Sequence, residues 1–487
     1  MMVCRASIPT TICLLLFIQT THVRPSEATA NGRSGKLELD AKGAYHSLAS
    51  TLGGLEALLI HITSGADWLV NISQVKTESL PVDLKNSRKY NYSNWRGAFR
   101  NEYDAGSKTW DTYGPVWHGG QAIRGLVAAS RVGQLVLNAL EITNRDQLAG
   151  LTAEMWKLRI HAWIDGAELC AGFILDKQVR SSDKENGMIL SYENSANAPQ
   201  SSTMLEGMRG LWDLAAATGN ATYAQAANAA VTWSVDNAWM RGHGLLYDLW
   251  DRQNQSFLHE GGWNYVTKDG VGRPLADDWT YLELYKQTKS ATAREAFYDV
   301  IERLYDDERP VGNWVDFIPC DPNKSHGGWL HPRQAFWWGR PFLAAYNDTK
   351  NVSYLNVAQR SGRWYANASR LDGGLIRQTA VDFTTSTFGQ VTSAVSCAAL
   401  LWMDLHTSDG DAEWLELATT GLKWVTAQQF DPARTNDPNL RGAVLELTNP
   451  PAGSDRPPYH IRDIATSFTL QALAKAATEY MTRGFPL

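Results

Sequence analysis

Two kinds of helical segment alternate along the sequence from residue 43 to its end. One kind carries an apolar stripe at helical spacing and a polar back, as in residues 223–233. The other kind is apolar nearly all round and rich in small residues, as in 122–129 and 394–402. A helix that is apolar on every side is normally buried on every side. The alternation therefore predicts a layer of inner helices surrounded by a layer of outer helices.

Twelve segments follow this pattern. Their expected bounds are 43–64, 118–133, 144–166, 200–218, 221–240, 277–289, 291–307, 334–346, 351–368, 385–406, 411–428 and 463–480. Short turns join each apolar helix to the amphipathic helix after it, whereas mostly longer loops lead to the next apolar helix. This asymmetry is typical of repeated helical hairpins. We expect an all-α fold, an (α/α)6 toroid of six hairpins, with short β-hairpins in the long loops of one face.

The first thirty residues have the pattern of a secretion signal. Arg5 precedes the apolar run 12–18, and Ala28-Thr29-Ala30 fits the small-residue cleavage pattern. We expect residues 1–30 to be removed, 31–42 to be flexible and 43–487 to form a single toroid domain. The apolar run is too short to span a bilayer, and no later stretch reaches the necessary length. No membrane contact is expected after cleavage.

Eight N-x-S/T sequons also indicate export. They begin at Asn71, Asn91, Asn220, Asn254, Asn323, Asn347, Asn351 and Asn367. Together with the signal they predict a secreted, extracellular glycoprotein. After cleavage three cysteines remain, Cys170, Cys320 and Cys397, so we expect one disulfide at most. The fold must therefore depend on packing.

Composition narrows the class of partner. A net charge of −6 leaves no basic stripe, which argues against nucleic acid. The chain contains 20 Trp, 18 Tyr and 13 Phe, and such rings fill cores but also stack on the faces of sugars.

If six hairpins close into a ring, the loops before the inner helices meet in one bowl. The candidate binding residues in these loops are Trp110, Tyr113, Trp117, His118, Asn194, Gln200, Trp279, His331, Arg333, Trp337, Arg340, Tyr459 and His460. Hydrogen-bonding groups interleaved with aromatic rings suit a saccharide, which offers hydroxyls at its rim and C–H faces above and below. Asp382, Thr384, Thr385 and Asp463 are instead expected to be ordinary helix N-caps.

Asp277 and Asp278 open the inner segment 277–289, with Trp279 beside them. The N-terminus of a helix favours one carboxylate, but two beside aromatic rings suggest catalysis. We expect Asp278 to be a general acid whose pKa is raised by its charged neighbour and by aromatic cover. The side chains of adjacent residues point apart, and the one nearer Trp279 should face the bowl. Glu193 is the expected second carboxylate, which would activate water or stabilise a cationic transition state.

Two short motifs add a resemblance to known enzymes. Asp277-Asp278-Trp279 resembles the Asp-Asp pair of the family 76 α-1,6-mannanases, and Trp338-Gly339-Arg340 resembles a segment of the unsaturated glucuronyl hydrolases of families 88 and 105. With the twelve-helix alternation, the chain is similar to the six-hairpin glycosidase superfamily. The resemblance implies an (α/α)6 toroid with its active site in the bowl. In the glucuronyl hydrolases, one Asp at an inner-helix start protonates the substrate's double bond.

The sequence thus predicts a secreted carbohydrate-active enzyme. A glycoside hydrolase acting on an oligo- or polysaccharide, such as a mannan or a chain containing uronic acid, is the first hypothesis. A lyase or sugar epimerase is the second, with a His or Tyr base and candidates in Tyr113, His118, Asn194, His331, Tyr459 and His460. A non-catalytic glycan-binding toroid is the third.

The same sequence leads us to expect no cofactor and a monomeric protein. It has no H-E-x-x-H motif and no paired C-x-x-C motif, so no zinc site is expected. Calcium stays open, because loop carboxylates and carbonyls can bind it without a regular motif.

Overall fold

The computed structural model describes residues 45–193, 198–258, 265–267, 270–317, 320–323, 328–375, 379–384, 390–448 and 459–483. The expected signal (1–30), the expected flexible segment (31–42), and Asn194 and Thr385 lie outside these residues. The division of the chain into signal, flexible segment and single toroid domain therefore stays a prediction.

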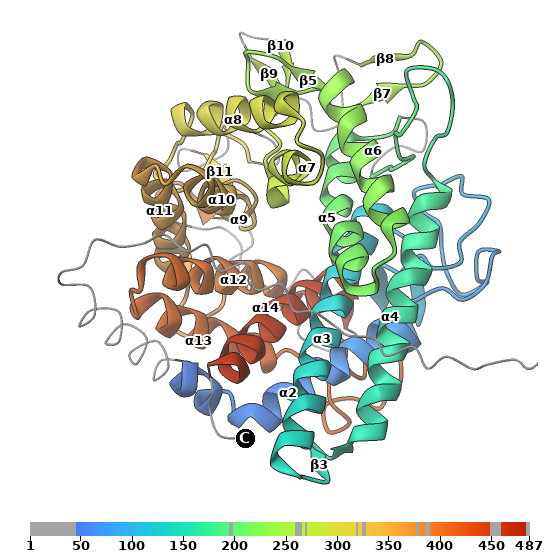
Figure 1. Cartoon of the computed structure of the whole chain (residues 1–487), viewed down its shortest axis with the longest axis vertical. Coiled ribbons are helices and arrows are strands. Elements are labelled where there is room, and N and C mark those ends of the chain that lie inside the picture. Colours follow the sequence, from blue (N-terminus) through green and yellow to red (C-terminus); the bar gives the residue numbers. More distant parts are fainter. Residues whose placement is uncertain are drawn as a thin grey trace, which may run out of the picture.

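The described helices form two concentric rings (Figure 1). The inner ring consists of α3 (Pro115–Thr143), α5 (Ser201–Thr218), α7 (Thr280–Thr288), α10 (Gly339–Thr349), α12 (Thr392–Asp409) and α14 (Asp463–Thr482). The outer ring consists of α2 (Gly54–Trp68), α4 (Ala153–Asp176), α6 (Ala221–Asn237), α8 (Ala291–Asp306), α11 (Val352–Ala368) and α13 (Glu413–Thr426). The expected (α/α)6 toroid is confirmed, and each of the twelve expected segments overlaps one of these helices.

Contacts between the two ends of the chain close the ring. The first outer helix, α2, packs against the last inner helix, α14, which also packs along α3. Strand β15 (His460–Arg462) pairs antiparallel with β1 (Glu102–Asp104), with Ile461 opposite Tyr103. The sixth hairpin therefore consists of α14 and α2, which come from opposite ends of the sequence.

Glycines let two inner helices touch backbone to backbone. A Cβ added to Gly120 of α3 would lie 2.3 Å from the Cα of Gly207 in α5, and one added to Gly210 would lie 2.3 Å from the carbonyl oxygen of Gly120. Side chains cannot fit at such distances. The small residues seen in the inner segments thus set how closely the inner helices approach.

Short strands occupy the loops, as expected. Strand β2 (Thr109–Asp111) completes a sheet of order β15–β1–β2. The two-stranded antiparallel pairs are β3 (Gln147–Leu148) with β4 (Leu151–Thr152), β5 (Trp239–Met240) with β6 (Leu245–Leu246), β7 (Trp250–Asp251) with β8 (Ser256–Phe257), β9 (Tyr265–Thr267) with β10 (Gly270–Gly272), β11 (Trp329–Leu330) with β12 (Thr379–Ala380), and β13 (Gln390–Val391) with β14 (Leu447–Thr448).

Several helix bounds differ from the expected ones for local reasons. Helix α3 runs ten residues past the expected end at 133, because apolar spacing continues until Asn144 adopts a left-handed conformation. The fourth inner segment breaks at Trp338 into the single turn α9 (Gln334–Trp337) and α10. A five-residue π-helical turn, η1 (Leu69–Ser73), follows α2.

None of the described helices combines the length and apolarity that crossing a bilayer requires. All eight sequon asparagines are exposed, and their glycosylation stays a prediction. Cys170, Cys320 and Cys397 are buried and none is bonded to another.

Candidate active site

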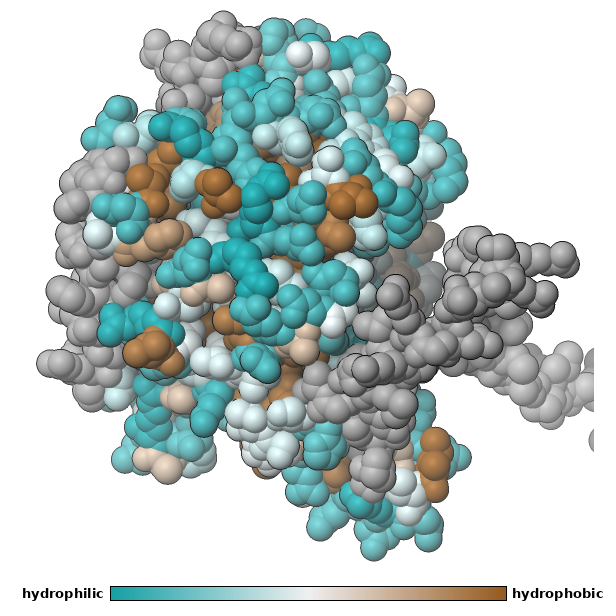
Figure 2. Space-filling model, turned by 90° about the vertical axis from the view of Figure 1, so that its left-hand side faces the viewer, coloured by the Kyte–Doolittle hydropathy of each residue, from teal (hydrophilic) through white to brown (hydrophobic). Residues whose placement is uncertain are grey.

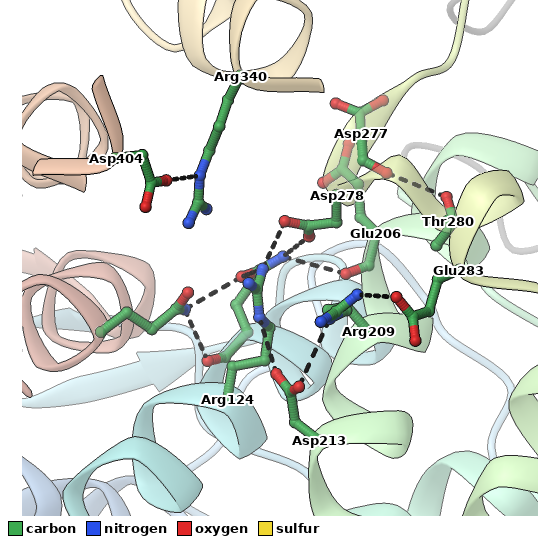
Figure 3. Close-up of polar contacts among 12 residues, drawn as sticks. Arg124, Glu206, Arg209, Asp213, Asp277, Asp278, Thr280, Glu283, Arg340 and Asp404 are labelled. Carbon is green, nitrogen blue, oxygen red and sulfur yellow. Dashed lines mark hydrogen bonds and ion pairs between the residues drawn. The ribbon is translucent and has the colours of Figure 1, made fainter. Parts of the chain in front are cut away.

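The Asp277–Asp278 pair lies in a 3-10 turn, η2 (Asp277–Trp279), that leads into α7. Asp278 and Trp279 both have left-handed backbones, with φ of 53° and 48°. This conformation costs residues with a side chain about 1–3 kcal/mol each, and it persists where surrounding contacts hold it. Figure 3 shows the result: the two Asp side chains point in different directions, and Asp278 is directed toward Arg124.

Asp278 is held as a carboxylate by two inner helices. Its Oδ1 lies 2.5 Å from Nη1 of Arg124, and Gln121 donates Nε2–H to its Oδ2 at 3.1 Å. Burial alone would raise the pKa of Asp278, but the charges of Arg124 and Arg340 outweigh it and hold that pKa below its usual value. Asp278 is therefore ionised at neutral pH.

Asp277 has the opposite electrostatic environment. Burial raises its pKa to about 7; the charge of Arg273 opposes this increase and the charge of Asp278 adds to it. Glu206 on α5 is also buried, and burial together with the charge of Asp277 raises its pKa well above the usual value. The raised pKa expected for Asp278 thus belongs to Asp277, with Glu206 as a second carboxyl that keeps its proton.

Ion pairs continue from Arg124 between the inner helices (Figure 3). Nε of Arg124 lies 3.4 Å from Asp213, and Asp213 lies 3.5 Å from Nε of Arg209. Nη1 of Arg209 in turn lies 2.8 Å from Glu283 on α7. These pairs fix the guanidinium of Arg124 in place beneath Asp278.

A second anchored arginine approaches from α10. Nε of Arg340 donates to Asp404 of α12 at 2.6 Å, and Lys475 of α14 contacts the other oxygen of Asp404 at 3.0 Å. The guanidinium of Arg340 lies 5.1 Å from the ring of Trp279, and that of Arg209 lies 5.2 Å from the same ring. Trp279 therefore packs against two cations beside the carboxyl pair.

A cavity of about 260 Å³ opens near this centre. Its lining consists of Glu102, His331, Pro332, Arg333, Val391, Glu446, Leu447, His460 and Arg462. Asp277 and Asp278 are not among them, so the carboxyl pair does not line this cavity. Arg333 lines the cavity, and its charge opposes the increase in the pKa of Glu206. Its Nη1 donates to Ser393 at 3.0 Å beside Glu446.

His118, at the start of α3, forms a buried pair with Asp463. Its Nδ1 hydrogen bonds to the carboxylate of Asp463, and Nη2 of Arg462 lies 3.5 Å from its Nε2. Burial lowers the pKa of His118, although Asp463 opposes this decrease. The expectation that Asp463 is an ordinary N-cap is wrong, because Arg462 occupies the cap position and the carboxylate binds His118. Asp382 likewise closes a turn with Thr384 and caps no helix.

Glu193 lies under a tyrosine at the bowl's edge. Tyr113 donates its hydroxyl to Glu193, and its ring lies 4.1 Å from the guanidinium of Arg88 and 4.4 Å from that of Arg462. The side-chain oxygen of Gln200 accepts the backbone N–H of Glu193 at 2.8 Å. Glu193 is therefore positioned by its neighbours, and its charge contributes to the raised pKa of Glu206.

The remaining expected site residues divide into two groups. His331 stacks on Trp337 with centroids 5.1 Å apart, and Arg333 lies over Trp337 at 5.2 Å and over Trp117 at 5.9 Å. His331 and Arg333 line the cavity, and the rings of Trp337 and Trp117 pack against these two side chains. Trp110, by contrast, is buried against Tyr103, and Tyr459 packs on Phe430.

Comparison with known proteins supports the architecture. No family model matches the chain, and no curated protein matches it in sequence. Among solved structures, a family 76 α-mannanase from Bacteroides thetaiotaomicron aligns with a TM-score of 0.54 at 14% identity, covering 88% of this chain and 98% of that one. An unsaturated glucuronyl hydrolase specific for heparin aligns with a TM-score of 0.53 at 12% identity, covering 92% and 97%. A D-mannose isomerase aligns with a TM-score of 0.55 at 10% identity, covering 86% and 97%.

The chain has the fold of the six-hairpin glycosidases. At these identities the likeness concerns the fold alone, and the chemistry has to be argued from this chain's own side chains.

Sequence reasoning missed buried polar and charged residues inside the inner helices of this six-hairpin fold. Gln121 and Arg124 lie within α3, Glu206 lies within α5, and all three are buried. Attention to loops before inner helices could not find them. The available signal was a charged residue within a largely apolar stretch of helix, since a buried charge must be paired or must change its protonation state. Glu102, Glu446 and Arg462 were also missed.

Among the described residues, no group of three or more His, Cys, Asp or Glu side chains is arranged to hold a metal ion.

Proposed function

We propose that this protein is a carbohydrate-active enzyme, and specifically a glycoside hydrolase. The observation that carries this proposal is the opposite shift of two adjacent carboxyls: Asp277 has a pKa of about 7, while Asp278 stays ionised beside Arg124. Pairs of carboxyls whose environments push their pKa values apart divide the acid and base roles of glycoside hydrolysis between them. Two structural neighbours named for mannanase and glucuronyl hydrolase activity lend support.

In this proposal Asp277 is the general acid. It transfers its proton to the glycosidic oxygen as the bond to the anomeric carbon breaks, so the leaving sugar departs as an alcohol. The expectation that Asp278 is the acid is less well supported, because its partner Arg124 favours the charged form. Asp278 instead offers a carboxylate that stabilises the cationic sugar or attacks its anomeric carbon. A water molecule then attacks the anomeric carbon, breaking its bond to Asp278 where one has formed, and the Asp277 carboxylate accepts the proton of that water.

The neighbouring cavity would hold the sugar. His331 and Trp337 supply a stacked pair of rings, and Arg333 and Arg462 supply hydrogen-bond donors at the wall. We propose oligo- or polysaccharides as substrates, including mannans and chains with uronic acid. Secretion, glycosylation and a monomeric state belong to the same proposal, and they fit the predicted signal and the exposed sequons.

An assay for new reducing ends tests the hydrolase directly. The secreted protein would be incubated with mannans, glucuronides and uronic-acid polysaccharides, in parallel with Asp277→Asn and Asp278→Asn variants. The proposal expects reducing ends with one substrate class and their loss in both variants. Activity that survives Asp277→Asn unchanged would rule out Asp277 as the acid.

A sugar epimerase or isomerase is the second candidate, because two histidines line the same cavity. His331 and His460 both face it, together with Glu446 and Arg333. A histidine base could take the proton from the carbon next to a sugar's carbonyl group, while Arg333 stabilises the charge that develops on oxygen. A cellobiose 2-epimerase from Spirochaeta thermophila, with a TM-score of 0.50 at 15% identity over 80% of this chain and 90% of that one, shares the fold.

Heavy water separates the two candidates. An epimerase or isomerase would incorporate deuterium at the carbon that loses its proton, without producing new reducing ends, and would stop in His331→Ala or His460→Ala. A lyase would instead produce an unsaturated sugar with ultraviolet absorbance. Reducing ends without deuterium incorporation would favour the hydrolase.

A further inference from the structure

A groove on the outer wall of the toroid lies outside the bowl. Six of its lining residues come from one face of α8: Ala291, Arg294, Glu295, Tyr298, Asp299 and Glu302. They repeat at spacings of three and four, so they form a single stripe along the outer helix. The turn between β5 and β6 and Tyr285 of α7 form its sides, and the depression, which is open to solvent, has a volume of about 800 Å³. We call this depression the α8 groove.

The wall around the groove is not a protein-docking surface of the usual kind. Figure 2 looks onto the side of the molecule that carries α8 and α11, and this side is mainly hydrophilic with scattered apolar residues. A docking surface for another protein would need a contiguous apolar patch.

Aromatic rings and fixed charges alternate inside the α8 groove. The guanidinium of Arg294 lies 4.9 Å from the ring of Tyr298 and 5.6 Å from the ring of Tyr285. Arg241 and Glu295 face each other through two hydrogen bonds of 2.8 Å at the opposite side. Flat surfaces flanked by preorganised hydrogen-bonding groups suit a saccharide, whose C–H faces pack on rings and whose hydroxyls bond to charged groups.

The same groove adjoins a sequon. Asp348 accepts hydrogen bonds from Nη2 of Arg294 at 2.8 Å and from the hydroxyl of Tyr298 at 2.6 Å. The residue immediately before it, Asn347, is exposed and begins the sequon Asn347-Asp348-Thr349. A sugar chain attached to Asn347 would therefore start beside the aromatic side of the groove. A tethered ligand needs few contacts, because its effective concentration at the neighbouring site is high.

We propose that the α8 groove binds the N-linked glycan of Asn347. The inference is independent of the chemistry in the bowl and rests on export of the chain through a glycosylating compartment. It makes α8 part of the binding surface for the protein's own saccharide and gives a role to the half-buried rings of Tyr298 and Tyr285.

Asn220 supplies a matched control in another hairpin. It begins the sequon Asn220-Ala221-Thr222 between α5 and α6, it is exposed, and its side-chain oxygen caps α6 by accepting the N–H of Thr222 at 3.1 Å. None of these three residues lines the α8 groove. A glycan on Asn220 therefore starts away from the groove.

The test measures how fast each glycan is removed from the folded protein. The chain is secreted from cells that make only high-mannose glycans and is treated with an endoglycosidase under native conditions, and the residual occupancy of each site is followed by glycopeptide mass spectrometry. The proposal expects both Asn347 and Asn220 to be glycosylated, and the glycan of Asn347 to be released at least about tenfold more slowly than that of Asn220. An empty Asn347, or equal release rates at both sites, would overturn it.

Three variants show whether the groove causes the protection. Tyr298→Phe keeps the ring and loses the hydroxyl, so protection should persist. Tyr298→Ser removes the ring, and release at Asn347 should accelerate to the rate at Asn220. Tyr285→Ser removes the second ring and serves if Tyr298→Ser fails to fold. Protection that is unchanged when the rings are removed would contradict the proposal.

Discussion

Arg124 of α3 contacts Asp278 at 2.5 Å, and this pair joins the inner helix of one hairpin to the beginning of another. Both side chains are buried. The pair determines which of two adjacent aspartates carries a charge at neutral pH, and therefore which one can deliver a proton.

The first prediction concerns the pH dependence of hydrolysis. Asp277 must be protonated to act as an acid, and its pKa is about 7. We expect kcat/KM to fall as the pH rises through about 7, and a second limb only at acidic pH, where Asp278 takes up a proton. The measurement is kcat/KM from pH 3 to 9. A profile that stays flat from pH 5 to 9 would exclude this acid.

The second prediction concerns stability against pH. Asp277 has a folded pKa above its unfolded value of 3.8, so between these values the native state holds a proton that the unfolded state has released. Stability should therefore decrease as pH rises from about 4 to 7, by an amount on the order of 4 kcal/mol from this group. Asp277→Asn should remove the decrease. Denaturation at pH 5 and pH 8 would measure it, and an equal loss in wild type and variant would assign it to other groups.

The third prediction concerns the buried ion pair. Arg124→Met leaves Asp278 buried without its nearest cation, and we expect a loss of about 3–5 kcal/mol in the free energy of unfolding. The double variant Arg124→Met/Asp278→Asn removes both charges and should recover much of this loss. Urea denaturation of the wild type, Arg124→Met, Asp278→Asn and the double variant gives the coupling energy. Additive losses would show that the two groups do not interact.

The fourth prediction concerns the contact between α3 and α5. Gly120→Ala places a Cβ within 2.7 Å of three backbone atoms of Gly207, which no side-chain rotation can relieve. We expect it to disrupt the inner ring and prevent stable folding.

Gly172→Ala is the control for that prediction. Gly172 is an exposed residue of α4, and no atom lies within 4 Å of an added Cβ. We expect Gly172→Ala to raise the free energy of unfolding by about 0.5–1 kcal/mol through helix propensity. Thermal unfolding compares the two variants. Equal effects at both glycines would mean that the close approach has no energetic weight.

The architecture could be predicted because helix periodicity is a local property. The contrast between segments apolar all round, such as α12, and striped segments, such as α13, directly reports inner and outer position. Helix ends were less predictable. No local pattern marks the break at Trp338, and the extension of α3 to Thr143 follows an apolar spacing that continues beyond the expected end at 133.

The division of roles within the Asp pair could not be predicted, for a geometric reason. The two side chains do point apart, as expected, but left-handed backbones at Asp278 and Trp279 direct Asp278 to Arg124, which keeps it charged. Arg124 is 154 residues away in sequence. Glu206 was missed for a related reason, since its importance arises only where α5 meets the turn before α7.

The way the ring closes has a consequence for biosynthesis. Helix α2 packs mainly against α14, and β1 finds one of its two neighbours only in β15. The apolar flank of the first hairpins in a nascent chain must therefore be covered by something else until residues 460–482 have been made. Folding of this protein should be completed after translation, and we expect chains truncated before α14 to be bound by chaperones and not to reach the native state.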